Sequence, residues 1–220
     1  MTSGLERFRH IAVEGPIGVG KSSLATRLAH HLGADLVLEQ PAENPFLHRF
    51  YADMGGYAFQ TQLFFLFQRQ QQLIEVAQSS VFASAVVSDF MFAKDALFAR
   101  LNLGDDEHRL YQQIYAQVAP KVREPDLVIW LQASTTTLAQ RIRRRGIEME
   151  QRIAPDYLDR LADAYGAHFQ AYDGAPVLAV STERFNPAAR AADFSLLVER
   201  VAAFTGPREY LSVASEPTLS

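Results

Sequence analysis

The segment EGPIGVGKSS, residues 14–23, contains residue types that could hold a triphosphate. It matches the pattern G-x-x-x-x-G-K-[ST], in which glycines let backbone N–H groups surround phosphate oxygens. Lys21 could reach the β- and γ-phosphates, the Ser22 hydroxyl could ligate Mg²⁺, and the helix that follows would present its positive end. A glycine-rich turn that binds nothing is the alternative interpretation. The predicted nucleotide-binding residues of this loop are Gly15, Gly18, Val19, Gly20, Lys21, Ser22 and Ser23.

Two carboxylates stand at the ends of later apolar runs, Glu39 after DLVL and Asp89 after SAVVS. Ligands of open parallel sheets bind beyond the carboxyl ends of the strands, so both side chains should face the phosphate loop. We predict that Asp89 and Ser22 orient Mg²⁺, the alternative being that Asp89 caps a helix near Met91. Glu39 could take the proton from an acceptor hydroxyl; its alternative is a solvated loop acid before Pro41.

The elements that must position these residues alternate along the chain. Apolar runs predict buried strands at 10–14, 35–39, 84–89, 126–132 and 176–181. Apolar residues three and four apart predict helices at 21–32, 61–78, 97–101, 106–119, 135–145 and 155–172. Strands that alternate with helices favour a mostly parallel sheet covered on both faces. Asp126 begins its strand, so it belongs at the opposite edge as a structural residue.

The bulk composition limits the class of protein. The 220 residues are 48% hydrophobic and 21% charged with a net charge of -4, which favours one α/β domain over 1–206 with a polar, partly disordered tail over 207–220. This charge does not indicate binding to nucleic acid polymers or anionic membranes. Without cysteine, disulfides and thiolate metal sites are excluded, which fits a cytoplasmic location. No apolar run approaches the roughly 20 residues of a membrane span, and the N-terminus has no secretory signal.

Together these motifs resemble the deoxynucleoside kinases, including the bacterial deoxyadenosine/deoxyguanosine kinases and the deoxycytidine kinase group. The similarity runs from about residue 10 to residue 172. It implies a P-loop NTPase fold with a five-stranded parallel sheet in the order 2-3-1-4-5, an arginine-rich lid, ATP and Mg²⁺ as cofactors, and a homodimer built on long helices.

The resemblance also implies a deoxynucleoside site. Gln62 corresponds to a glutamine that bonds the base, and Arg69, two helical turns later, lies on the same helix face. Asp95 corresponds to an aspartate that pairs with this arginine, while Tyr51 and Glu150 correspond to contacts with the sugar 3′-hydroxyl. Solvated helix positions are the alternative for Gln62 and Arg69, and a helix-surface acid is the alternative for Asp95. The predicted substrate-binding residues are Glu39, Tyr51, Gln62, Arg69, Asp89, Asp95 and Glu150.

The segment RIRRRGIEMEQRI resembles the family's lid. Arg141, Arg144 and Arg145 could close over the triphosphate and neutralise charge during transfer, whereas Arg143 should face solvent. The alternative is a basic helix end favoured by the helix dipole. The predicted catalytic residues are Glu39, Lys21, Arg141 and Arg145.

Two departures from the family pattern remove positive charge. Phe90 stands where an arginine follows the aspartate of the third strand, and Ile147 stands where the lid has a further arginine. The leading hypothesis remains transfer of the ATP γ-phosphoryl group to the 5′-hydroxyl of a deoxynucleoside, with a purine preferred. The alternatives are a kinase acting on a nucleoside monophosphate or another small molecule, and a catalytically impaired nucleotide-binding regulatory protein.

Overall fold

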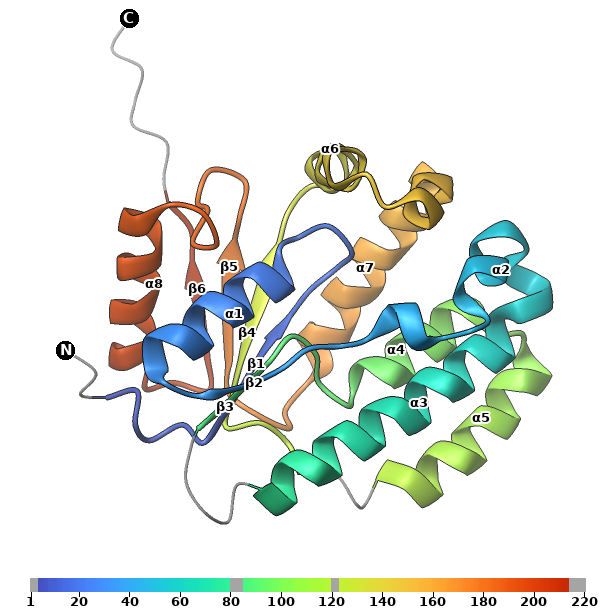
Figure 1. The fold of residues 1–220 in the computed structure, drawn as a ribbon, viewed down its shortest axis with the longest axis horizontal. Helices are drawn as coiled ribbons and strands as arrows, with labels where there is room; N and C mark the ends of the chain where they lie inside the picture. The colour runs from blue at the N-terminus through green and yellow to red at the C-terminus, as the bar shows by residue number, and fades with distance from the viewer. Residues whose placement is uncertain (1–3, 80–84, 120–122, 214–220) are drawn as a thin grey trace, which may run out of the picture.

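The computed structural model describes residues 4–79, 85–119 and 123–213. At its centre lies a twisted sheet in which each neighbouring pair of strands runs parallel, with helices on both faces (Figure 1). The strand order is β2-β3-β1-β4-β5-β6. The strands are β1 (His10–Glu14), β2 (Asp35–Val37), β3 (Val86–Ser88), β4 (Leu127–Gln132), β5 (Val177–Ser181) and β6 (Arg208–Leu211).

The α/β class and the order of the first five strands are confirmed, but the described part of the sheet has six strands rather than five. The additional strand, β6, pairs with β5 and lies in the segment predicted as a polar tail. Its four residues are polar or only partly buried, and Tyr210 is 64% exposed, so this edge strand lacks the apolar signal of the others. Residues 214–220 of the predicted tail lie outside the described residues.

Each predicted helix has a counterpart in the structure, but the described residues also form helices that were not predicted. Helix α3 begins at Met54 rather than at Thr61, and the sequence interpretation omitted α2 and α8. Short 3-10 turns cover Pro41–Glu43 and Glu148–Arg152. The helices are α1 (Lys21–Leu32), α2 (Leu47–Ala52), α3 (Met54–Ser79), α4 (Lys94–Asn102), α5 (Asp105–Val118), α6 (Thr135–Arg145), α7 (Pro155–Ala171) and α8 (Ala191–Ala203).

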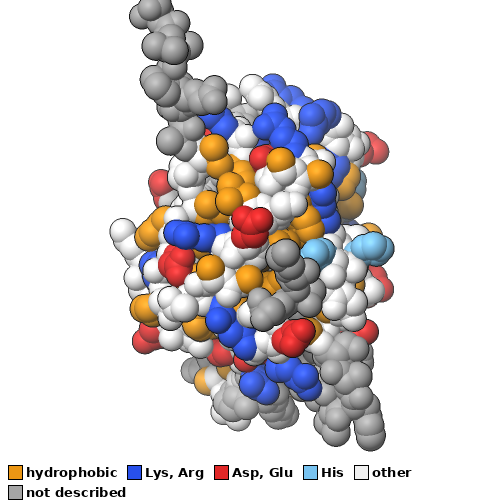
Figure 2. All heavy atoms as spheres, turned by 90° about the vertical axis from the view of Figure 1, so that its left-hand side faces the viewer, with side chains coloured by type: hydrophobic (Ala, Val, Ile, Leu, Met, Phe, Trp, Pro, Cys, Tyr) orange, Lys and Arg blue, Asp and Glu red, His pale blue; other side chains and the backbone are white. Residues whose placement is uncertain are grey.

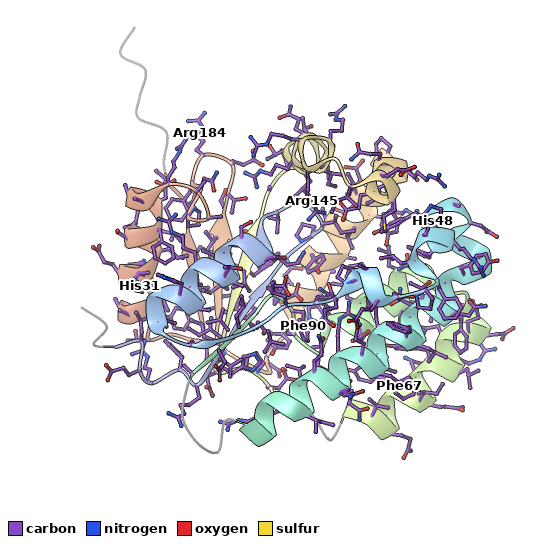
Figure 3. The ribbon with its side chains drawn as sticks, viewed as in Figure 1. His31, His48, Phe67, Phe90, Arg145 and Arg184 are labelled. Atoms are coloured by element: carbon purple, nitrogen blue, oxygen red, sulfur yellow. The ribbon has the colours of Figure 1, made fainter. Side chains whose placement is uncertain are left out.

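The core lies in two layers, one on each face of the sheet. Successive residues of β1 alternate between them: Ile11 and Val13 pack with α1 and α8, whereas Ala12 packs with the layer that contains α3, α4 and α7. Phe90 belongs to this second layer, is fully buried, and lies in the interior of the molecule (Figure 3). The side chain at position 90 therefore serves packing.

The molecular surface in Figure 2 carries a mixture of side-chain types. On the face shown in Figure 2, basic and acidic side chains are interspersed with hydrophobic ones. Within residues 4–79, 85–119 and 123–213, no helix is both long enough and apolar enough to cross a bilayer.

The parallel sheet brings three loops to one edge: the phosphate loop after β1, the segment after β2 and the segment after β3. At the opposite edge, Asp126 accepts hydrogen bonds from the backbone N–H groups of Arg9 (2.6 Å) and His10 (2.8 Å). The prediction that Asp126 is structural agrees with these contacts.

Candidate active site

Glycines shape the phosphate loop by allowing a close approach of neighbouring elements. Gly15 has φ +144°, and a side-chain carbon there would collide with the carbonyl oxygen of Leu131 in β4. Gly18 has φ +84°, and such a carbon would lie 2.8 Å from Cγ1 of Ile142 in α6. The loop is therefore closely packed beneath β4 and α6, and α1 begins at Lys21 directly after it.

Two cavities meet at this loop. The α6 cavity, about 370 Å³, is lined by Val19, Gly20, Ser23, Arg141, Arg144 and Thr182, among others. The α3 cavity, about 290 Å³, is lined by Glu39, Tyr51, Gln62, Arg69, Asp89 and Glu150, among others. Gly18, Lys21, Ser22 and Arg145 line both, so the two cavities share the lysine and the serine of the motif.

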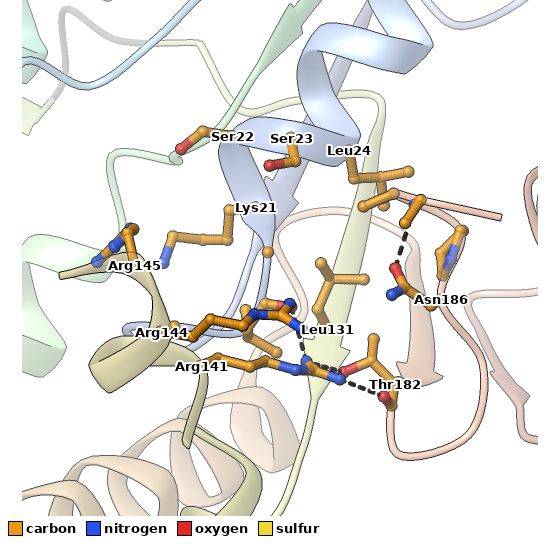
Figure 4. A pocket seen from close by; sticks show the side chains of 16 residues that line it. Lys21, Ser22, Ser23, Leu24, Leu131, Arg141, Arg144, Arg145, Thr182 and Asn186 are labelled. Atoms are coloured by element: carbon orange, nitrogen blue, oxygen red, sulfur yellow. Dashed lines mark hydrogen bonds between the residues drawn. The ribbon is translucent and has the colours of Figure 1, made fainter. Parts of the chain in front are cut away.

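In the α6 cavity, Arg141 is held by the loop after β5 (Figure 4). Its Nη1 donates to the Val19 carbonyl (3.2 Å) and to Thr182 Oγ1 (2.9 Å), and its Nη2 donates to the Thr182 carbonyl (2.6 Å). Arg143 and Arg144 are both exposed, but only Arg144 lines the cavity, which agrees with the predicted solvent-facing position of Arg143. The predicted nucleotide residues other than Gly15 line this cavity, whereas Gly15, the first residue of the motif, packs against Leu131 of β4.

Sequence reasoning missed the wall that faces these arginines. Thr182 and the segment 186–189 follow the carboxyl end of β5 and complete the lining of the α6 cavity. Their location at the ligand-binding edge of a parallel sheet was the available signal.

A buried charge network occupies the α3 cavity. Arg69 donates from Nε to Oε1 of Glu39 (2.7 Å), from Nη2 to the same oxygen, and from Nη1 to Oδ1 of Asp95 (2.6 Å). Gln62, Arg69 and Asp95 are 2%, 3% and 0% exposed, so the alternative of solvated positions is wrong for these three. Oε1 of Gln62 is buried and has no hydrogen-bond partner within the protein.

The network fixes the charge of its carboxylates. Burial raises the pKa of Glu39, but the Arg69 and Lys94 cations outweigh it and lower that pKa to about 2. Burial raises the pKa of Asp95 to about 6, against the opposing effect of Arg69. Glu39 is therefore an anion at neutral pH, with its two oxygens held by different cations: Oε1 by Arg69 and Oε2 by Lys94 (3.3 Å).

Asp89 joins the phosphate loop to the segment that carries Glu39. The Ser22 hydroxyl donates to Oδ2 of Asp89, and the Glu39 backbone N–H donates to Oδ1 (2.7 Å). Because α4 begins at Lys94, Asp89 does not cap that helix. A hydroxyl and a carboxylate are hard oxygen donors of the kind that Mg²⁺ binds beside phosphate oxygens, so this pair fits the ion. Among the described residues, no group of three His, Cys, Asp or Glu could hold a metal by itself.

The residues predicted to contact the sugar line the α3 cavity beside Arg145 of the predicted lid. Tyr51 and Glu150 both line it, and Arg145 forms an ion pair with Glu150 through Nη2 and Oε2. Burial raises the pKa of the Tyr51 hydroxyl, which stays protonated and can donate a hydrogen bond. Ile147, at the lid position that lacks an arginine, lines the same cavity.

Two buried charged residues of the site were not predicted. Lys94 lies in the first turn of α4 and lines the α3 cavity. Glu14, the last residue of β1, is fully buried and accepts hydrogen bonds from Gly15 N (2.8 Å), Met91 N (3.2 Å) and the Tyr165 hydroxyl (3.0 Å). An acid at the end of a buried strand, next to the phosphate loop, was the signal that could have revealed Glu14.

A phosphate loop between the first strand and helix of a parallel sheet, with a second cavity across the loop, defines a kinase of the P-loop NTPase fold. Residues 11–205 match the family described as Deoxynucleoside kinase, and the chain belongs to this family. It is 34% identical to a deoxyguanosine kinase of Bacillus subtilis over 156 residues, covering 70% of this chain and 75% of that protein. It is 30% identical to a deoxyadenosine kinase of Lactobacillus acidophilus over 190 residues, covering 80% of this chain and 86% of that protein.

The solved structures agree on the fold. A deoxyadenosine kinase from M. mycoides with bound dCTP superposes with a TM-score of 0.74 at 24% identity, covering 89% of this chain and 100% of that chain. The predicted resemblance and the enzyme class, an ATP-dependent phosphotransferase of the deoxynucleoside kinase family, are thus confirmed.

Proposed function

We propose that this chain transfers the γ-phosphoryl group of ATP to the 5′-hydroxyl of a purine deoxynucleoside. The observation that carries the proposal is the convergence of Glu39, Gln62 and Arg69 in one cavity that opens onto Lys21 and Ser22. ATP would occupy the α6 cavity with its phosphates at the shared loop, and the deoxynucleoside would occupy the α3 cavity.

In this arrangement, Glu39 accepts the proton of the 5′-hydroxyl while that oxygen bonds to the γ-phosphorus. The bond from the γ-phosphorus to the bridging oxygen breaks, and ADP leaves with that oxygen. Lys21 and the backbone N–H groups of the loop hold the phosphates, and Arg145, which borders both cavities, can reach the charge on the transferred group. Mg²⁺, held by Ser22 and Asp89, would neutralise the charge of the triphosphate.

The purine preference rests on Gln62 and on the relatives. Its unpartnered Oε1 can accept from an exocyclic amine, and its amide N–H can donate to a ring nitrogen, a pattern that suits adenine. Relatives over most of the chain are named deoxyguanosine or deoxyadenosine kinases. Tyr51 and Glu150, which line the same cavity, would hold the sugar 3′-hydroxyl.

A monophosphate acceptor is disfavoured by the pairing of Arg69. Both ends of its guanidinium are bonded to carboxylates, so it is not available to neutralise a phosphate group in this cavity.

The proposal includes a homodimer and a cytoplasmic location, as predicted from the resemblance and from the cysteine-free composition. Phe67 on α3 and Leu110 on α5 are 49% and 48% exposed, which supplies apolar contact area on the long helices. Sedimentation of the purified chain checks the dimer.

The test of the function is a steady-state assay with ATP and Mg²⁺ over the four deoxynucleosides and their monophosphates. We expect 5′-monophosphate products, with deoxyadenosine or deoxyguanosine turned over faster than thymidine. Equal rates for thymidine and deoxyadenosine would contradict the purine preference. Stabilisation by ATP without product from any acceptor would instead support a nucleotide-binding regulatory protein.

A further inference from the structure

Lys94 is a buried cation between two carboxylates. Lys94 is 3% exposed, and its Nζ lies 3.3 Å from Oε1 of Glu14 and 3.3 Å from Oε2 of Glu39. A lysine in the first turn of a helix faces the unfavourable end of the dipole, and burial of its ammonium group costs further free energy. The two carboxylates offset these costs, so the position of Lys94 is explained by its partners rather than by the helix.

The two partners of Lys94 differ in how firmly they are held. Glu14 is fixed by three further hydrogen bonds, from the phosphate loop, from the segment after β3 and from α7. Glu39 lies beyond the end of β2 in a loop, and its side chain is 17% exposed toward the α3 cavity. Lys94 thus connects a rigid anchor at the end of β1 to a carboxylate on a loop.

The contacts of Glu39 are divided between its oxygens. Arg69, which also donates to Asp95, holds Oε1. Lys94, which also contacts Glu14 at the start of the phosphate loop, holds Oε2. Lys94 also lines the α3 cavity together with Lys21 of the phosphate loop. Its ammonium group therefore belongs to the same cavity as the phosphate-loop lysine and the Glu39 carboxylate.

We propose that Lys94 is a positioning residue for Glu39: with Glu14 as its anchor, it turns the Glu39 carboxylate toward the acceptor hydroxyl beside the phosphate loop. The proposal rests on the proposed function, in which Glu39 takes the proton. It also accounts for Phe90, because the cation absent from that position is supplied to the same cavity by Lys94, which follows four residues later at the start of α4.

The experiment is a double-mutant cycle with Lys94→Met and Glu39→Gln, assayed with ATP, Mg²⁺ and deoxyadenosine or deoxyguanosine. Lys94→Met removes the charge and keeps an unbranched side chain that is one heavy atom shorter. We expect kcat to fall about tenfold to a hundredfold, with KM for both substrates near the wild-type values. In the Glu39→Gln background, Lys94→Met should cause little further loss of kcat, because its effect acts through the carboxylate. The control is Arg100→Met, which removes an exposed cation from the same helix and should leave kcat unchanged.

Additive losses in the cycle, or an unchanged kcat in Lys94→Met, would overturn the inference while leaving the proposed function intact. A wild-type chain without turnover would overturn the proposed function itself, and the inference with it. If Lys94→Met fails to fold, Lys94→Arg decides: retention of most of the wild-type kcat supports a positioning cation, and a loss as large as that of Glu39→Gln overturns it.

Discussion

The two cavities at the phosphate loop hold their cations in different ways. In the α6 cavity, Arg141 donates to two carbonyls and a hydroxyl, whereas in the α3 cavity Arg69 and Lys94 donate to carboxylates. A cation bonded to neutral oxygens keeps its charge available to an anionic ligand. A cation bonded to buried carboxylates is committed to hold them in place. The difference suits one cavity to polyphosphate and the other to a neutral ligand with polar edges.

The largest expected effect comes from a substitution of Glu39, which should impair the α3 cavity and leave the α6 cavity intact. Glu39→Gln keeps the size of the side chain and removes the base, so kcat for a deoxynucleoside should fall roughly 10²- to 10⁴-fold. Binding of ATP, measured by thermal shift, should stay near wild type because Glu39 does not line the α6 cavity. Glu43→Gln, at an exposed acid nearby, is the control. A similar kcat in Glu39→Gln and wild type would mean that another group takes the proton.

A second prediction concerns stability. Arg69→Met leaves Glu39 and Asp95 without their shared cation, so the free energy of unfolding should fall by about 3–5 kcal/mol, as in other broken buried ion pairs. Urea unfolding measures it. Arg160→Met, which breaks a pair between side chains that are 57% and 77% exposed, should change the same quantity by less than about 1 kcal/mol. Equal effects of the two variants would contradict the distinction between the buried network and the surface.

The third prediction affects the α6 cavity. Arg141→Ala removes the bonds that join α6 to the phosphate loop and to Thr182, so KM for ATP should rise about tenfold. KM for the deoxynucleoside should change little, since Arg141 does not line the α3 cavity. Arg143→Ala, at an exposed neighbour on the same helix, should leave both constants unchanged. If Arg141→Ala raised KM for ATP and KM for the deoxynucleoside equally, the two cavities would not bind their ligands independently.

The smallest expected effect is a pH dependence of stability that comes from His10. Burial lowers the pKa of His10 from 6.5 to about 4, so the folded chain favours the neutral imidazole. The stability that His10 contributes is therefore present above pH 6.5 and is lost as the pH falls toward about 4. Between pH 7.5 and 4.5, the melting temperature should fall less in His10→Gln than in wild type. If the protonation of His10 is not coupled to folding, the melting temperatures of wild type and His10→Gln should fall by the same amount.

The sequence predicted those parts of the site that depend on local spacing and on the edge of a parallel sheet. The family resemblance singled out Gln62 and Arg69, and two helical turns place them on one face; the ends of strands place Glu39 and Asp89 at one edge. Each of these rules acts within one element or one sheet, so a pattern in the chain suffices.

The remainder depends on contacts that no local pattern encodes. Lys94 becomes part of the site only because the start of α4 packs beside the ends of β1 and β2, which are distant in sequence. The strand β6 is an edge strand with partly exposed residues, so its sequence carries little apolar signal. Helix α8 did carry one, since Phe194, Leu197, Val198 and Val201 are buried at helical spacing, and that omission was avoidable.

Asp89 holds Ser22 with one oxygen and the backbone of Glu39 with the other. The carboxylate is therefore a mechanical link as well as the predicted ion ligand, and it ties the nucleotide-holding turn to the chain segment that bears the proposed base. We expect kinetic defects of any Asp89 substitution to combine weaker retention of the divalent ion with misalignment of the acceptor side, so such a variant alone cannot measure what the ion contributes.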